Sequence, residues 1–97
     1  MELSSIPDAF QSALRLSVLS AVMMGEKSFR ELKRITGATD GNLGAQIRKL
    51  EEQGYLVCEK TFSARKPLTT VSLTPFGREQ FREYVELLER IIKEATK

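Results

Sequence analysis

The sequence contains no histidine, no tryptophan and only one cysteine, Cys58. A single cysteine cannot form a disulfide within the chain, and the absence of histidine excludes a Cys/His zinc site. No apolar run reaches the roughly 18 residues of a membrane-spanning helix, and the first residues lack the basic start of a secretion signal. We therefore expect a soluble protein in a reducing, cytoplasmic setting that does not bind a membrane.

The residue types that catalysis usually needs are also scarce. There is no histidine base and no glycine-rich phosphate loop, and the acidic residues alternate with lysine and arginine as on solvated helix surfaces. Only Lys60 lies close enough to Cys58 in sequence to lower the pKa of its thiol. We interpret Cys58 as a small core residue, with a redox sensor as the alternative, and we expect no enzymatic activity, no cofactor and no metal.

The charge of the chain is small but unevenly distributed. The 97 residues are 41% hydrophobic, which suits one compact domain over residues 1–97, and the net charge is +2. Residues 27–66 hold nine basic and five acidic residues, whereas the segment before them is acidic and the segment after them is neutral. The central segment is therefore the part of the chain best suited to contact a polyanion.

Two helices are predicted in the first part of the chain. The spacing of apolar residues indicates a helix over about residues 7–24, with an apolar stripe wide enough for burial on more than one side. Ser28 and Glu31 match a capping box, so a second, short helix is expected to begin at Phe29. Its apolar face is predicted to consist of Phe29, Leu32 and Ile35.

A third helix follows after a short turn. Gly37 can take the left-handed conformation that ends helices, and Thr39 or Asp40 can cap the next helix, which should end at Gly54. Two short helices joined by a turn of three or four residues that contains glycine are typical of a helix-turn-helix.

The third helix has two different faces. At 100° per residue, one side carries the apolar residues Leu43, Ile47 and Leu50. The other side is polar or small, with Gln46 at its edge: Gly41, Asn42, Gly44, Ala45, Arg48 and Lys49. Asparagine and glutamine can read adenine edges, and arginine and lysine can reach guanine or phosphate. A solvated surface without a ligand is the alternative interpretation.

Two strand-like segments follow the third helix. Residues 55–62 and 68–73 are rich in aromatic and β-branched residues, which indicates a β-hairpin. The predicted tip, residues 63–67, contains Arg65 and Lys66, which suit contact with the DNA backbone or the minor groove. The order helix, helix-turn-helix and hairpin is that of a winged helix, an α+β fold that is mostly helical.

The last segment is predicted to form one long helix. Thr74 is a suitable N-cap and Pro75 suits the first helical position, so the helix should span residues 75–97. Its apolar stripe is longer than a core of this size can cover, which favours a second subunit as its cover. The residues expected at the dimer interface are Phe81, Tyr84, Val85, Leu88, Ile91 and Ile92. A monomer with the stripe folded onto its own core is the alternative.

Three segments are distinctive: Asp-Gly-Asn-Leu at 40–43 and Arg-Lys-Leu-Glu at 48–51 are the most specific, and Arg-Lys-Pro at 65–67 is the next most specific. With these segments the chain resembles a family of small prokaryotic winged-helix transcriptional regulators, related more loosely to the MarR and ArsR groups. The resemblance implies DNA binding, dimerisation and a cytoplasmic location. The family often has serine and histidine near positions 44 and 46, where this chain has Gly44 and Gln46, so a family DNA sequence preference does not transfer.

We therefore predict a homodimeric regulator that binds double-stranded DNA. The third helix, residues 40–53, would enter the major groove, and the wing, residues 63–67, would contact the backbone or the minor groove. The expected DNA-binding residues are Thr39, Asn42, Ala45, Gln46, Arg48, Lys49, Arg65 and Lys66. A winged-helix module that docks onto another protein is the alternative.

Overall fold

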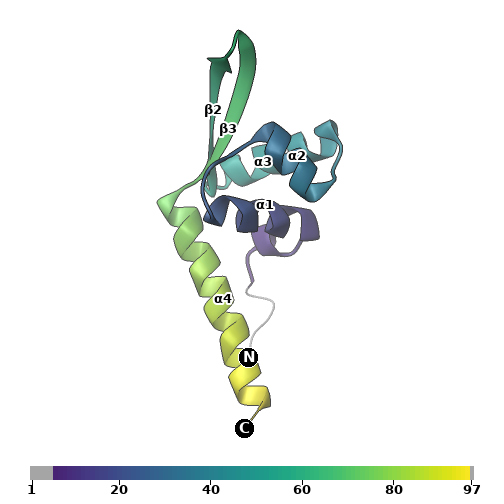
Figure 1. Ribbon diagram of the computed structural model, residues 1–97. Coiled ribbons are helices and arrows are strands. Elements are labelled where there is room, and N and C mark those ends of the chain that lie inside the picture. The colour runs from purple at the N-terminus through teal and green to yellow at the C-terminus, as the bar shows by residue number, and fades with distance from the viewer. Residues whose placement is uncertain (1–5, 97) are drawn as a thin grey trace.

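The structure is a computed structural model that describes residues 6–96, so the two ends of the predicted domain, residues 1–5 and 97, lie outside the described residues. Figure 1 shows the order of elements. They are the short 3-10 helix η2 (Asp8–Phe10), α1 (Ala13–Met23), β1 (Lys27–Ser28), α2 (Phe29–Thr36), α3 (Asp40–Glu52), β2 (Leu56–Ser63), β3 (Lys66–Leu73) and α4 (Pro75–Ala95). The predicted winged helix, mostly helical with a hairpin wing, is confirmed.

The first helix is shorter than the sequence pattern indicates. Instead of one helix over residues 7–24, the chain forms η2 and then α1, which has 11 residues. Ser12 between them is extended, with φ −125° and ψ 132°, and its Oγ accepts a hydrogen bond from the backbone N–H of Arg15 at 3.3 Å. The wide apolar stripe therefore comes from two elements that meet at an N-cap, and the expected long N-terminal helix is corrected to a short one.

The predicted ends of α2 and α3 agree with the structure. The Ser28 hydroxyl accepts from the N–H of Glu31 and the Glu31 carboxylate accepts from the N–H of Ser28, so the capping box is present. Gly37 ends α2 in the left-handed region at φ +72°. Thr39, rather than Asp40, caps α3. These local interactions fix where the two helices of the helix-turn-helix begin and end.

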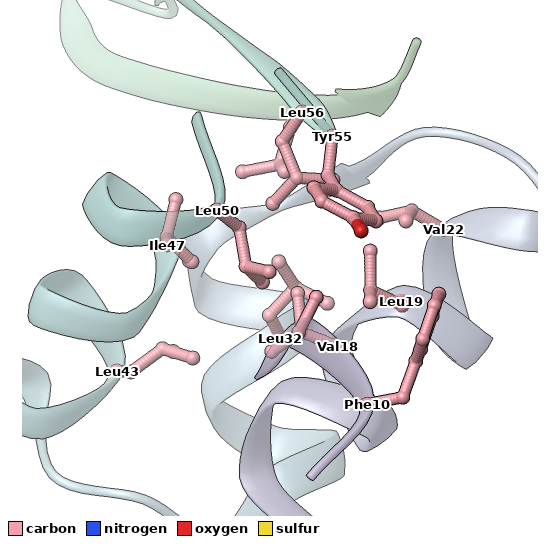
Figure 2. Close-up of a cluster of buried hydrophobic side chains, with 12 residues drawn as sticks. Phe10, Val18, Leu19, Val22, Leu32, Leu43, Ile47, Leu50, Tyr55 and Leu56 are labelled. Carbon is pink, nitrogen blue, oxygen red and sulfur yellow. The ribbon is translucent and has the colours of Figure 1, made fainter. Parts of the chain in front are cut away.

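The core lies between α1, α2, α3 and the base of the sheet. Leu43, Ile47 and Leu50 point from α3 into this cluster (Figure 2). All twelve members are almost completely buried: Ala9, Phe10, Val18, Leu19, Val22, Leu32, Leu43, Ile47, Leu50, Tyr55, Leu56 and Val71. The expected apolar face of α2 is only partly correct, because Leu32 is buried whereas Ile35 is exposed.

The sheet has three antiparallel strands in the order β1-β3-β2. The two-residue strand β1 was not predicted. The hairpin closes at the pair Ser63↔Lys66, so its turn is Ala64 and Arg65 and not the five residues expected. The next pair places Pro67 opposite Phe62 in a non-hydrogen-bonded position, where proline needs no N–H toward β2.

Helix α4 begins at the base of the wing and extends in the opposite direction from it, as Figure 1 shows. Thr74 and Pro75 begin it as predicted, and the Thr74 hydroxyl accepts from the N–H of Gly77 at 2.9 Å. The helix has 21 residues, of which only Gly77 is buried. Because α4 extends away from the other helices, the molecule is elongated, with extents of 57 × 25 × 21 Å. No helix within residues 6–96 has the length and apolar character needed to cross a membrane.

Candidate nucleic-acid interface

Helix α3 divides its side chains between the core and solvent as the sequence predicts. Leu43, Ile47 and Leu50 hold its inner face in the core, and this fixes the rotation of the helix. On the outer side Thr39, Asn42, Ala45, Arg48 and Lys49 are exposed, while Gln46 is half-buried. The Thr39 hydroxyl accepts from the backbone N–H of Asn42 at 3.2 Å, so this residue caps the helix in the isolated chain. The outer face of α3 is thus largely exposed to solvent.

Two polar residues of this face already have partners in the chain. The Gln46 Oε1 accepts a hydrogen bond from Arg15 Nη1 at 2.8 Å. The Lys49 Nζ lies 3.2 Å from Asp8 Oδ2. The hydrogen bond from Lys49, followed by the charge of Arg15, lowers the pKa of the Asp8 carboxyl below its ordinary value. Arg48 has no hydrogen-bond or ion-pair partner among residues 6–96.

The outer face of α3 also contains small residues that the fold does not require. A Cβ added at Gly41 or Gly44 would meet no atom within 4 Å, and neither glycine needs a positive φ. Glycine inside a helix destabilises it by roughly 0.5–1 kcal/mol relative to alanine. The packing of the described chain therefore gives no reason for these two glycines, and they leave room for close approach of another surface.

The wing presents its basic tip to solvent. Ala64 and Arg65 both have positive φ, 52° and 67°, which is the backbone of a type I′ hairpin turn. Arg65 and Lys66 are exposed, as the sequence predicts. Lys66 also lines a hollow of about 400 Å³ between the wing and the start of α2, which includes Ser28 and Arg30.

The positive charges of α2 were not among the predicted DNA-binding residues. Arg30, Lys33 and Arg34 are all exposed and line a shallow depression together with Gly37. Lys33 is paired with Asp40 at 2.7 Å, which leaves the two arginines as the free cations of this surface within the described residues. The sequence signal for these two residues was their spacing of four, which places them together on the polar side of α2. The first helix of a helix-turn-helix crosses the DNA backbone, so cations on that side can reach phosphates.

Cys58 lies half-buried in β2 next to the end of α3. Its backbone N–H donates to Glu51 Oε2 at 3.1 Å. Burial, and then the negative charge of Glu51, raises the pKa of the Cys58 thiol. These surroundings favour the protonated, less reactive thiol.

The apolar stripe of α4 is only partly covered by the chain itself. Phe81 and Tyr84 pack on Phe10, whose ring lies 6.0 Å from Phe81 edge-on and 4.7 Å from Tyr84 in a stack. Further along the helix Ile91 is half-buried, and the remaining three of the predicted interface residues are exposed: Val85, Leu88 and Ile92. The second half of α4 therefore carries apolar surface without a partner in the described chain.

A family description entitled "Winged helix DNA-binding domain" matches residues 14–92, which include the helix-turn-helix, the wing and most of α4. The chain belongs to this family. An uncharacterized protein of Methanocaldococcus jannaschii is 34% identical over 83 residues, which are 82% of this chain and 89% of that protein.

Solved structures support the same assignment. A transcriptional regulator homologue from Pyrococcus horikoshii OT3 is 26% identical and has a TM-score of 0.81, with 89% of this chain and 86% of that chain covered. A protein from Enterococcus faecalis V583, described as a transcriptional regulator of the MarR family, is 26% identical and has a TM-score of 0.76. The match covers 97% of this chain and 82% of that chain. The fold is thus that of MarR-type winged-helix regulators, and the family is that of the winged-helix DNA-binding domain, which implies DNA binding.

Proposed function

We propose that this winged-helix protein is a homodimeric transcriptional regulator that binds double-stranded DNA sequence-specifically in the cytoplasm. The observation that carries the proposal is that α3 exposes most of its outer face while the wing projects a basic tip beyond the helices. Residues 40–53 would lie in the major groove, and residues 63–67 would contact the backbone or the minor groove. The regulators that resemble this chain support the same assignment.

The exposed residues of α3 divide into two roles in this proposal. Asn42 and Ala45 would contact base edges, and Arg48 would reach guanine or phosphate because no residue of the described chain engages it. Thr39 would contact a phosphate beside the start of α3. Gln46 and Lys49 would contribute through the side-chain groups that Arg15 and Asp8 leave available.

The dimer is proposed to form through α4. Val85, Leu88 and Ile92 are exposed apolar residues on one side of that helix, and burial of each would contribute about 1.5 to 3 kcal/mol to association. Phe81, Tyr84 and Ile91 would extend the interface from the half-buried edge of the same stripe. A symmetric dimer presents two recognition helices and therefore binds two half-sites of one operator.

A salt series separates DNA binding from docking onto a protein. An electrophoretic shift assay on sheared genomic DNA at about 50 and 200 mM salt should show affinity that falls steeply with salt, because phosphate contacts release counterions. Selection of bound fragments then supplies a specific site. Absence of binding at low salt would refute the proposal and leave the protein-docking alternative.

Two variants test the placement of α3 and the wing. Asn42→Ala should weaken binding to the selected site by about 1 to 3 kcal/mol and leave binding to random DNA nearly unchanged. Replacing both Arg65 and Lys66 by alanine should weaken binding to every sequence and reduce the slope of log affinity against log salt by about 0.9 per lost phosphate contact. The matched control replaces Arg78 and Lys93, two exposed cations of α4, and should leave that slope unchanged.

A further inference from the structure

Arg15 occupies an unusual position between the N-terminal turn, α1 and α3. Its side chain is only 11% exposed. Nη1 donates to Gln46 Oε1 at 2.8 Å, and Nη2 donates to the backbone oxygen of Asp8 at 3.0 Å and lies 3.4 Å from Asp8 Oδ1. One guanidinium therefore links a side chain of the proposed recognition helix to two other elements.

The hydrogen bonds of Arg15 are not completed within the chain. Its Nε is buried and has no partner among the described residues. A buried donor without a partner destabilises a fold, and apolar replacements of buried charged groups are often neutral or stabilising. Stability therefore does not explain why an arginine stands here, and its bond to Gln46 is the contact that reaches the DNA-facing side.

The bond from Arg15 decides which end of the Gln46 amide is available. An arginine can only donate, so the atom that it contacts must be the amide oxygen. The Nε2 group, with its two N–H donors, has no hydrogen-bond partner among residues 6–96. Gln46 follows Asn42 by four residues and precedes Lys49 by three, so it lies on the same ridge as two exposed residues. Arg15 takes one of the two lone pairs of Oε1, so Gln46 offers two donors and one remaining acceptor position along the direction fixed by Arg15.

We propose that Arg15 is a positioning residue that makes Gln46 a hydrogen-bond donor to the major groove and so determines a base preference. In that groove guanine presents two acceptors, N7 and O6, whereas adenine presents one acceptor and the N6 donor. A free glutamine pairs with adenine through both its oxygen and its nitrogen. The bond from Arg15 takes one of the two lone pairs of that oxygen and fixes the amide, which disfavours this two-bond pairing. Gln46 therefore prefers guanine to adenine, which replaces the adenine contact that its residue type alone would indicate. The inference rests on the proposed function.

The test measures base preference in a site selected with the full chain. Gln46→Ala first identifies the base pair that Gln46 contacts, because this variant should lose its preference among bases at that position only. At this position the wild-type chain should prefer guanine to adenine by about fivefold or more, within the range for a good base contact. Arg15→Met keeps an unbranched stem and removes the guanidinium donors, so it should bring the ratio to one or reverse it toward adenine. In the Gln46→Ala background Arg15→Met should have no effect on the ratio.

Two further variants separate the hydrogen bond from charge and from folding. Gln46→Glu retains the acceptor for Arg15 but removes the donors, so the guanine preference should disappear and cytosine, which presents an N4 donor, should gain. Asp8→Asn removes the charge beside Arg15 without touching Gln46 and should leave the base ratio unchanged. Circular dichroism and the unchanged discrimination at the position read by Asn42 show that each variant is folded and docked.

Two results would overturn the inference. One is a site at which Gln46→Ala changes no base preference, and the other is an adenine preference that Arg15→Met leaves intact. Either result leaves specific DNA binding by the wild-type chain in place. Failure of the proposed function is different, because then the wild-type chain itself selects no duplex sequence.

Discussion

The segment from η2 to β3, here called the body, and helix α4 use their apolar side chains in opposite ways. All twelve residues of the buried cluster belong to the body, whereas α4 contributes only Gly77 to the buried residues in its 21 positions. Phe81 and Tyr84 join α4 to Phe10, and beyond them Val85, Leu88 and Ile92 are exposed. The body thus folds on its own contacts, while α4 has apolar surface available for a second chain. Substitutions on this surface of α4 are therefore expected to change the association of two chains more than the free energy of unfolding of one chain.

The largest effect is expected from a cavity in the body. Leu19→Ala removes a fully buried side chain of α1 and should lower the free energy of unfolding by about 2–5 kcal/mol. The same truncation at Ile92, which is 63% exposed, should change the unfolding of the monomer by less than about 0.5 kcal/mol. Urea unfolding at low protein concentration measures both. Equal losses would mean that α4 is part of the core.

The sequence predicted the body well because its signals are local. The capping box at Ser28, the left-handed Gly37 and the Thr39 cap each depend on side chains within three residues of a helix end, and all three are confirmed. The inner face of α3 is confirmed for the same reason, since helical spacing fixes which residues share a face.

The errors arose where a distant contact or a backbone choice decides the outcome. Ser12 interrupts the first apolar stripe by taking an extended backbone, which the spacing of apolar residues does not show. The turn at Ala64 and Arg65 has only two residues although neither is glycine, asparagine or aspartate, the usual residues of such turns. In the candidate site, the partner of Gln46 is Arg15, 31 residues earlier, and no local pattern links them.

The second prediction concerns association through α4. Leu88→Lys places a charge within the apolar stripe and should yield a monomer at micromolar concentration, while Glu89→Lys puts the same side chain one position around the helix and should still dimerise. Loss of the second half-site should weaken binding to a two-site operator by about a hundredfold or more. Sedimentation velocity and shift assays measure the two effects. A dimer that survives Leu88→Lys would place the interface elsewhere, with α1 as the next candidate.

A pair of helical glycines sharpens the comparison between packing and recognition. A Cβ at Gly77 of α4 would overlap the backbone oxygen of Tyr55, which accepts from Thr74, so Gly77→Ala should destabilise the chain by about 1–3 kcal/mol. Gly44→Ala in α3 meets open space and should stabilise the chain by about 0.5–1 kcal/mol.

The two substitutions should differ in DNA binding as well. Gly44→Ala should weaken specific binding although it stabilises the fold, because the added methyl group occupies space that the duplex approaches. Thermal unfolding and shift assays on the same samples provide both values. A Gly44→Ala protein that is more stable and binds DNA as well as the wild type would remove Gly44 from the interface.

The smallest expected effect concerns the thiol of the body. Burial and the charge of Glu51 raise the pKa of Cys58, so the folded chain retains the thiol proton at a pH where the unfolded chain begins to lose it. The contribution of this proton to stability is therefore present below the ordinary thiol pKa of about 8.5 and is lost as the pH rises through the folded value.

Alkylation at pH 8 tests whether the Cys58 thiol is protected in the folded chain. Cys58 should react with iodoacetamide more slowly than a thiol introduced on α4 by Glu89→Cys in a Cys58→Ser background, because the α4 position is exposed. Glu51→Gln should accelerate the reaction of Cys58, since it removes the negative charge while an amide oxygen can still accept from the Cys58 N–H. If Cys58 reacts as fast as the α4 thiol, it is accessible and ionised as a redox sensor requires, and its interpretation as a packed core residue is wrong.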